Sequence, residues 1–152
     1  MYGCSNEKKA LRKMISSRFG LIATLLLLFS WQVSAVEIIS HPGVKATSLP
    51  LSSLRSIFSM RLTQWPDGTQ IRVFVLRDKA PLHAEFSKKM LGVFPHQLRR
   101  AWNRQIFSGT GQAPITIDTE ADMRSQVTST PGAIGYLPEE QVNEQVRTIE
   151  IE

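Results

Sequence analysis

The sequence predicts a single compact α/β domain in which a mixed sheet is flanked by helices. Short runs of β-branched and apolar residues alternate along the chain with segments whose apolar residues recur at helical spacing. This alternation is typical of a sheet that has helices packed on its faces. Residues 36–152, about 117 residues, suffice for one hydrophobic core and not for two. We therefore expect one domain over residues 36–152.

The first part of this domain predicts a strand, a short helix and a turn. Residues 36–40, VEIIS, form a β-branched run that ends at His41, Pro42 and Gly43. Residues 51–58 predict an amphipathic helix, because apolar side chains recur at Leu51, Leu54, Ile57 and Phe58. Residues 65–68, WPDG, contain Pro, Asp and Gly in the order that is typical of a tight turn.

The middle of the domain begins with the strand that we expect to be central. Residues 70–76, QIRVFVL, are nearly all apolar or β-branched, as in a strand covered on both faces. A helix follows from about Ala80 to Gly92. Its expected buried face holds Leu82, Phe86 and Met90, and Glu85 and Lys89 pair on another face.

A third helix is predicted over residues 95–106. Its apolar stripe consists of Leu98, Trp102 and Ile106, and its solvated face of Arg99, Arg100 and Arg104. The Gly-rich segment 108–114 then breaks this helix. Residues 108–111, SGTG, lack the Lys-Ser/Thr ending of a P-loop, so we interpret them as a plain connection.

The last part of the domain predicts a short strand at 115–117, a helix and two further strands. The helix runs from Glu120 to about residue 128, capped by Thr119, with Met123 and Val127 facing inward. Strands are expected at residues 133–137 and 146–151.

Residues 1–35 have the composition of an export signal. Basic residues precede an uninterrupted apolar stretch, residues 19–31, and Val33 and Ala35 suit a cleavage site after Ala35. The apolar stretch of about 13 residues is shorter than the roughly 20 that span a membrane, which favours a cleaved signal over an N-terminal membrane anchor. Met14 is a second candidate start. We expect a periplasmic protein that meets the membrane only during export.

Removal of residues 1–35 during export changes the net charge and the cysteine content of the domain that remains, residues 36–152. Five of the 18 basic residues and one of the 13 acidic residues lie in residues 1–35, which leaves 13 basic and 12 acidic residues. The net charge of +5 over the whole chain therefore gives no reason to expect nucleic-acid binding. The single cysteine, Cys4, precedes the apolar stretch, so residues 36–152 contain no thiol or disulfide.

The junction between the predicted central strand and its helix is the first candidate binding site. Ligands of α/β sheets bind at the carboxyl ends of the strands, where helices also direct backbone N–H groups. Arg77 ends the strand and could hold an oxyanion with two hydrogen bonds, with Lys79 as a second charge. The alternative is that Arg77 pairs with Asp78 or another surface acid.

Several segments together resemble the phosphate-binding, PstS-type periplasmic solute-binding proteins. They are IFS at 57–59, WPDG at 65–68, the strand that ends in Arg77, Phe86, Trp102 and TPGAIGY at 130–136. TPGAIGY is the most specific of them, and the resemblance runs over about residues 37–138. It implies part of a type II periplasmic-binding-protein fold and an association with ABC-type phosphate transport.

The chain departs from this family at the expected ligand loop. The family typically follows its arginine with Asp-Gly-Ser-Gly-Thr, whereas Asp78 is followed here by Lys79, Ala80, Pro81 and Leu82. These residues offer no hydroxyl, and Pro81 has no N–H to donate. We also expect part of the family's N-terminal lobe to be absent. The predicted oxyanion ligands are Arg77, Lys79, Ala80 and Leu82.

Other chemistry has little support in the sequence. His41, His83 and His96 show no paired metal-ligand spacing, Ser108 lies in no GxSxG elbow, and no cofactor motif is present. Asp118, Glu120 and Asp122 are interpreted as first-turn residues of a helix. We predict a non-enzymatic, solute-binding-like protein for phosphate or a similar small oxyanion. The alternative is an interaction or structural protein of the cell envelope that keeps the fold and has lost the ligand. Its partner would be a transporter or another envelope protein.

Overall fold

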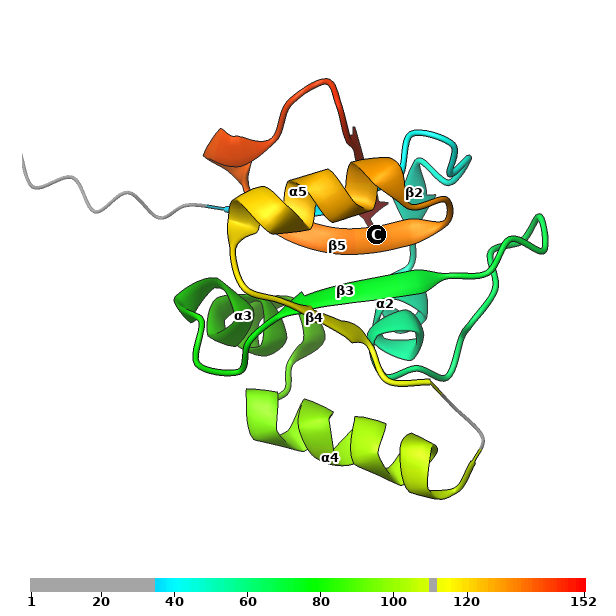
Figure 1. The fold of residues 1–152 in the computed structure, drawn as a ribbon, viewed down its shortest axis with the longest axis vertical. Helices are drawn as coiled ribbons and strands as arrows, with labels where there is room; N and C mark the ends of the chain where they lie inside the picture. Colours follow the sequence, from blue (N-terminus) through cyan, green and yellow to red (C-terminus); the bar gives the residue numbers. More distant parts are fainter. Residues whose placement is uncertain (1–34, 110–111) are drawn as a thin grey trace, which may run out of the picture. The chain divides into compact units, whose positions relative to one another are not determined.

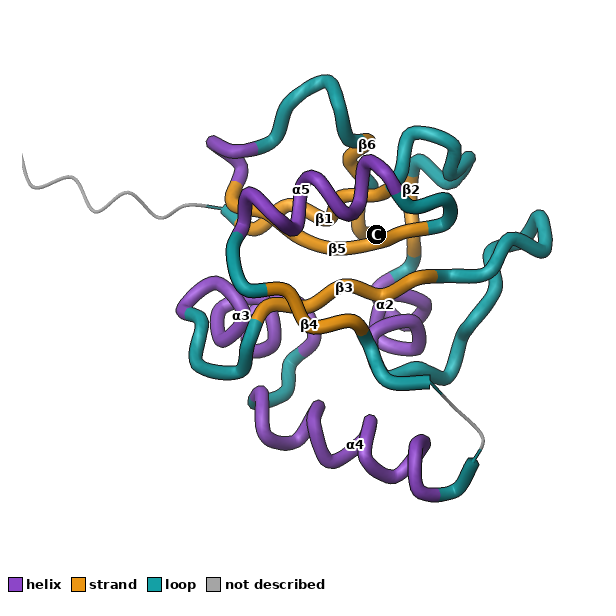
Figure 2. The backbone as a smooth tube through the Cα atoms, viewed as in Figure 1, coloured by secondary structure: helices purple, strands orange, loops and turns teal. Residues whose placement is uncertain are grey.

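A computed structural model describes residues 35–109 and 112–152, and its centre is a five-stranded sheet (Figures 1 and 2). The strands follow the order β4 (Ile115–Ile117), β3 (Arg72–Leu76), β5 (Ala133–Pro138), β1 (Val36–Ser40) and β6 (Arg147–Thr148). β3 runs parallel to β4 and β5, while β1 is antiparallel to β5 and β6. The predicted mixed sheet is confirmed.

β3 is an interior strand of the sheet, as the apolar run at residues 70–76 predicted. Residues 73–76 are buried, and β3 lies between β4 and β5. Its register pairs Arg72 with Ala133 on one side and Leu76 with Ile117 on the other. The carboxyl ends of β3 and β4 therefore meet at the same edge of the sheet.

The C-terminal residues form two short strands where one was predicted. β6 pairs with β1, and β7 (Glu150–Ile151) pairs in parallel with β2 (Ser48–Leu49) in a separate two-stranded sheet. Ile149 lies between β6 and β7, only 1% exposed, and its N–H donates to the carbonyl of Ile38 at 2.9 Å. The single strand predicted over 146–151 is wrong because the chain changes partners at this buried residue.

Helices cover both faces of the sheet. The helices of the described residues are α2 (Leu51–Phe58), α3 (Pro81–Glu85), the π-helix η1 (Phe86–Leu91), α4 (Pro95–Phe107), α5 (Glu120–Ser129) and the short η2 (Glu139–Gln141). Successive side chains of a strand point to opposite faces. At Gly135 an added Cβ would meet Met123 and Val127 of α5, whereas Tyr136 stacks on Phe86 at 4.0 Å between ring centroids. α5 thus covers one face, and the helical segment 81–91 covers the other (Figure 1).

The helix predicted from Ala80 to Gly92 changes its winding at Phe86. Residues 86–91 form a π-helix, whose bonds join residues five apart. Leu91, five residues after Phe86, is therefore buried at 3% exposure, while the predicted Met90 is only half-buried. The predicted pair forms, with 2.6 Å between Lys89 Nζ and Glu85 Oε1.

α4 packs through only part of its predicted apolar stripe. Leu98 and Trp102 are buried, and the indole N–H of Trp102 donates to the carbonyl of Phe58 at 2.7 Å. Ile106 is 42% exposed, so its predicted burial is wrong. Phe107, the last residue of α4, is exposed as well, so the end of the helix is not buried.

The TPGAIGY segment, residues 130–136, builds the junction between β5 and β3. Gly132 has φ +74°, and a Cβ there would lie 2.2 Å from the carbonyl oxygen of Gln70. The carbonyl of Gly132 accepts the indole N–H of Trp65 at 3.0 Å. The glycine is therefore required both by backbone conformation and by close approach.

The capping predicted for α5 is confirmed, since Thr119 Oγ1 accepts the N–H of Asp122 at 3.1 Å. The predicted export signal, with cleavage after Ala35 and the second start at Met14, falls on residues that the structure does not describe, apart from Ala35 itself. Among the described residues, no helix is long and apolar enough to cross a membrane.

Candidate functional site

The loop after β3 connects the sheet to α3 through a tight turn. The N–H of Ala80 donates to the carbonyl of Arg77 at 2.8 Å, and Ala80 then serves as the N-cap of α3. Pro81 occupies the first helical position, where its fixed φ is tolerated and its missing N–H removes no helical hydrogen bond. Residues 77–80 are thus placed at the carboxyl edge of the sheet.

Arg77 pairs with Asp118, which follows the neighbouring strand. Because Leu76 of β3 is in register with Ile117 of β4, the next residue of each strand lies at the same edge. Arg77 Nε lies 2.5 Å from Asp118 Oδ1, and both side chains are more than 60% exposed. The hydrogen bond from Arg77 lowers the pKa of Asp118 below its usual value, and the same bond raises the pKa of Arg77. The alternative in which Arg77 pairs with a surface acid describes this structure.

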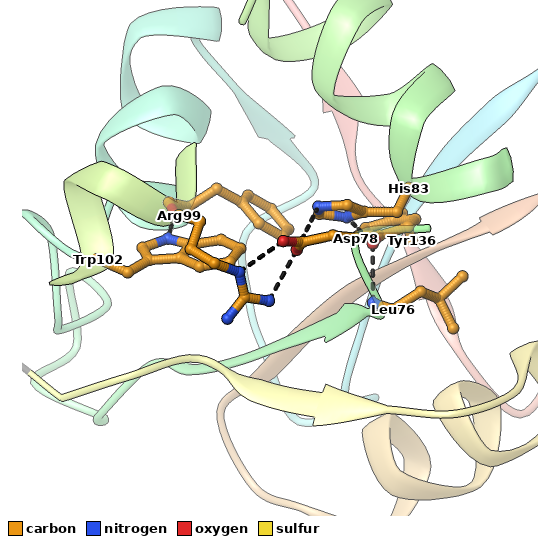
Figure 3. A network of polar contacts seen from close by, with 7 residues as sticks. Leu76, Asp78, His83, Arg99, Trp102 and Tyr136 are labelled. Atoms are coloured by element: carbon orange, nitrogen blue, oxygen red, sulfur yellow. Dashed lines mark hydrogen bonds and ion pairs between the residues drawn. The ribbon is translucent and has the colours of Figure 1, made fainter. Parts of the chain in front are cut away.

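Asp78 pairs with Arg99 of α4 through two hydrogen bonds, of 2.6 and 2.7 Å (Figure 3). The Arg99 guanidinium also lies 5.6 Å from the ring centre of Trp102. Hydrogen bonding to Arg99 holds the pKa of Asp78 below its usual value. Arg99 therefore anchors α4 to the loop, whereas the sequence placed it on a solvated face with Arg100 and Arg104.

Behind Asp78 lies a buried polar cluster of Leu76, His83 and Tyr136 (Figure 3). The Tyr136 hydroxyl accepts the N–H of Leu76 at 2.9 Å and lies 2.6 Å from His83 Nδ1. His83 and Tyr136 are both fully buried. The cluster ties β3, β5 and α3 together directly beneath the loop.

The protonation of this cluster follows from its donors and acceptors. Burial lowers the pKa of His83, so the ring is neutral near pH 7, and burial raises the pKa of Tyr136. Since the Tyr136 oxygen already accepts from Leu76, we infer that its proton is donated to His83 Nδ1. The ring proton of His83 then lies on Nε2, which faces Asp78 Oδ1 at 3.9 Å and has no hydrogen-bond partner among the described residues.

The four predicted ligand residues differ in what they present to solvent. Arg77 and Lys79 are exposed, while Ala80 is half-buried and Leu82 is a core residue at 8% exposure. The backbone N–H of Ala80 already bonds to Arg77, so a ligand would compete for it. The side chains available to an anion are therefore those of Arg77 and Lys79.

The acidic residues near α5 have separate roles. Asp118 precedes the N-cap Thr119 and pairs with Arg77, so its interpretation as a first-turn helix residue is wrong. Glu120 accepts a hydrogen bond from the amide of Gln141, and Asp122 accepts one from the Thr119 hydroxyl. Within the part of the chain that the structure describes, no three His, Cys, Asp or Glu side chains gather as metal ligands would.

Sequence reasoning missed the partners of the loop rather than the loop itself. One signal was available for Asp118, because it follows a predicted strand as Arg77 does, and parallel neighbours bring such residues together. The pairing of Asp78 with Arg99 and of His83 with Tyr136 joins residues 21 and 53 positions apart. No spacing in the sequence indicates those pairs.

The fold is similar to solved phosphate-transport proteins. A phosphate transport receptor of the ABC type from Vibrio cholerae matches with a TM-score of 0.63 at 16% identity, covering 78% of this chain and 46% of its own. A protein from Clostridium perfringens, assigned as a phosphate ABC transporter substrate-binding protein and solved with phosphate bound, matches with a TM-score of 0.62 at 19% identity, covering 78% and 45%. PstS from Borrelia burgdorferi gives 0.62 at 15%, covering 78% and 47%.

These matches establish the fold as part of a periplasmic-binding-protein fold. The chain spans less than half the length of each of these proteins. No protein-family model matches the chain, and no curated protein is a significant match.

Proposed function

We propose that this protein is an exported, non-enzymatic solute-binding-like protein that binds phosphate or a similar small oxyanion at the carboxyl end of β3. The observation that supports this most directly is the position of Arg77. Its exposed guanidinium lies at the edge of the sheet where ligands of such folds bind. Its bond to Asp118 uses Nε, and its two terminal nitrogens make no hydrogen bond within the described residues. They remain available to an oxyanion.

The electrostatics of the loop imply weak binding. Arg77 and Lys79 add positive charge, but Asp118 lies within hydrogen-bond distance of Arg77 and must be displaced or share the guanidinium with the ligand. Asp78 is already neutralised by Arg99. An affinity in the millimolar range, about 4 kcal/mol of binding free energy, would fit one exposed arginine and one lysine.

The cellular setting of the proposal rests on two lines of support. Residues 1–35 have the pattern of a cleaved export signal. The solved proteins of similar fold are phosphate-transport and phosphate-binding proteins. We therefore place the protein in the periplasm, in association with an ABC-type phosphate uptake system.

A second candidate function is favoured by the same loop. Both acids near the loop are paired with arginines, and Ala80, Pro81 and Leu82 offer no hydroxyl. A domain that has kept this fold without its ligand would serve as an interaction or structural protein of the cell envelope, with a transporter or another envelope protein as its partner.

Calorimetry separates the two functions. Protein purified from cells that express the full coding sequence is titrated with phosphate and with sulfate, alongside the variants Arg77→Ala and Arg72→Ala. Arg72 is the matched control, because it is an exposed arginine at the opposite end of β3. Oxyanion binding should be weakened about tenfold or more by Arg77→Ala and unchanged by Arg72→Ala. No heat at millimolar concentrations would favour the second function, whereas equal heats for both variants would contradict the assignment of the site to Arg77.

A further inference from the structure

A pocket of about 220 Å³ lies between α2, the end of η1 and α4, on side chains that the loop after β3 does not use. Leu91 and Leu98 line it, both at most 4% exposed, with the half-buried Val93 and Ala101. These four apolar side chains come from the end of η1, the connection to α4, and α4 itself. The pocket therefore has an apolar surface suited to a hydrocarbon group.

Two arginines line the same pocket, and no acidic residue does. Arg55 is held in place, since its Nε donates to the carbonyl of Leu91 at 3.0 Å. Its guanidinium lies against Gly92, where an added Cβ would come within 3.2 Å of Nη2. Arg61 makes no ion pair with any residue that the structure describes. The lining also includes the polar residues Ser59 and Gln97, and it combines a fixed cation, a free cation and an apolar surface.

The backbone that carries Arg61 is also well defined. Helix α2 ends with Met60 in the left-handed conformation, φ 62°. The N–H of Met60 bonds to the carbonyl of Ile57 at 2.9 Å, and the N–H of Arg61 bonds to that of Ser56 at 2.8 Å. This is the pairing of a Schellman motif, in which the left-handed position is usually glycine. Met60 accepts the strained conformation, with its side chain buried at 8% exposure, and the next residue, Arg61, lines the pocket.

Arg61 also lines a neighbouring pocket of about 290 Å³. The lining of this second pocket includes Ser52, Ser53 and Ser56 of α2. Arg61 thus lines both pockets, and the second is lined by Leu62 as well as by the three serines. A ligand that used both the cationic and the apolar lining of the 220 Å³ pocket would place its anionic group at the arginines and its apolar group against Leu91 and Leu98.

We propose that this pocket binds a small amphiphilic anion, a carboxylate attached to a short apolar body. A carboxylate accepts two parallel hydrogen bonds from a guanidinium, which matches the chemistry of Arg55 and Arg61. The volume equals that of about seven liquid water molecules, which suits a ring or short chain rather than a drug-sized molecule. Inorganic phosphate lacks the apolar part and would gain nothing from the apolar surface.

Phenylacetate is the probe, with two controls that each lack one half of its chemistry. Acetate has the carboxylate without the ring, and 2-phenylethanol has the ring without the charge. Each is titrated into ¹⁵N-labelled protein, purified from cells that express the full coding sequence, and followed by backbone amide chemical shifts. Phenylacetate should shift the amides of Leu91, Val93 and Leu98 and bind about tenfold more tightly than either control.

Two variants test the two halves of the pocket. Arg61→Gln removes the free cation and should weaken phenylacetate binding about tenfold, while Arg100→Gln, an exposed arginine of α4 outside the pocket, should not. Ala101→Leu fills the apolar side and should abolish binding. If Ala101→Leu does not fold, Arg61→Gln still decides the matter, because within residues 35–109 and 112–152 the Arg61 side chain forms no ion pair or hydrogen bond, while its backbone N–H bonds to Ser56.

The proposal is overturned if phenylacetate at about 10 mM leaves the amides of Leu91, Val93 and Leu98 unshifted. Equal binding by wild type and Arg61→Gln would overturn it as well. Failure here is distinct from failure of the oxyanion site, because Arg77→Ala should leave phenylacetate binding unchanged. Phosphate binding at Arg77 should likewise be unaffected by Ala101→Leu.

Discussion

Residues 130–136 lead into and form part of β5, and residues 77–80 follow the neighbouring strand β3, yet the two segments are built in opposite ways. In the first segment the residues from Gly132 onward are buried, and each contact leaves little room for another residue: Gly132 against Gln70, Gly135 against Met123, Tyr136 against Leu76 and His83. In the second segment Arg77 and Lys79 are exposed, and Arg77 is held by a single surface carboxylate.

This difference separates two parts of the resemblance to phosphate-binding proteins, the part that concerns the fold and the part that concerns the ligand-binding residues. In the TPGAIGY segment, packing and backbone conformation constrain Gly132, Gly135 and Tyr136, so this part of the resemblance concerns the fold. In the loop after β3 the side chains of Arg77 and Lys79 are exposed, and this loop departs from the Asp-Gly-Ser-Gly-Thr of the family that the sequence resembles. The two segments therefore carry different information, the first about the fold and the second about the proposed ligand chemistry. The predictions below separate the two segments by stability and by binding.

The largest effect is expected at Gly132. Gly132→Ala adds a Cβ 2.2 Å from the backbone oxygen of Gln70, at φ +74°, so the chain must move or unfold. We expect a loss of roughly 3 kcal/mol or more in the free energy of unfolding, measured by urea denaturation. Gly68→Ala is the control. Gly68 has φ +85° with no atom within 4 Å of the added Cβ, so only the conformational cost of about 1 kcal/mol applies. Equal losses would show that close packing around Gly132 is unimportant.

The next effect is expected at Tyr136. Tyr136→Phe removes the hydroxyl and leaves the N–H of Leu76 and Nδ1 of His83 buried without that partner. We expect roughly 2 kcal/mol of destabilisation, measured by thermal or urea unfolding. Oxyanion binding should remain, because the hydroxyl is buried beneath the loop. A variant as stable as wild type would contradict the hydrogen-bond assignment.

A smaller effect should appear in the pH dependence of stability. Burial lowers the pKa of His83 in the folded state, so the unfolded chain binds a proton more readily. Stability from this group is complete above the unfolded pKa of about 6.5 and is lost as the pH falls below it. Urea unfolding at pH 7 and pH 5 should show this loss in wild type and a reduced loss in His83→Gln. His96→Gln, at an exposed histidine of α4, should keep the wild-type loss.

The smallest change in stability, and the clearest in binding, is expected at Asp118. Asp118→Asn removes the charge that competes for Arg77, so oxyanion affinity should rise several-fold while the melting temperature stays unchanged. Glu144→Gln controls for net charge, because Glu144 is an exposed acid outside the loop. Calorimetry with sulfate checks both variants. Lower affinity in Asp118→Asn would mean that Asp118 assists the ligand instead of competing with it.

The fold was largely predictable because its signals are local. The run at 70–76, the apolar spacing at 51–58 and the cap at Thr119 each depend on neighbours in the sequence. The misses are non-local: the change of partners at Ile149, the π-helix at Phe86 and the exposure of Ile106 depend on which element lies opposite. The two-residue strand β2 is too short for any periodicity.

The candidate site was predictable in place but not in detail. Arg77 marks the end of a strand that hydrophobicity identifies, and the carboxyl edge of a sheet is a general binding position. Its pairing with Asp118 required knowing that β3 and β4 are parallel neighbours in a particular register. The pairing of Asp78 with Arg99 required the position of α4, which the sequence does not indicate.

The central claim is that ligand chemistry lies at residues 77–82 and not in the buried segment 130–136. A phosphate titration of the ¹⁵N-labelled protein, followed by backbone amide shifts, tests it most directly. We predict shifts at Arg77, Lys79, Leu82 and Asp118 that saturate in the millimolar range, with the amides of residues 132–136 nearly unchanged. No shift at about 10 mM phosphate, or shifts that are largest away from this loop, would contradict the claim.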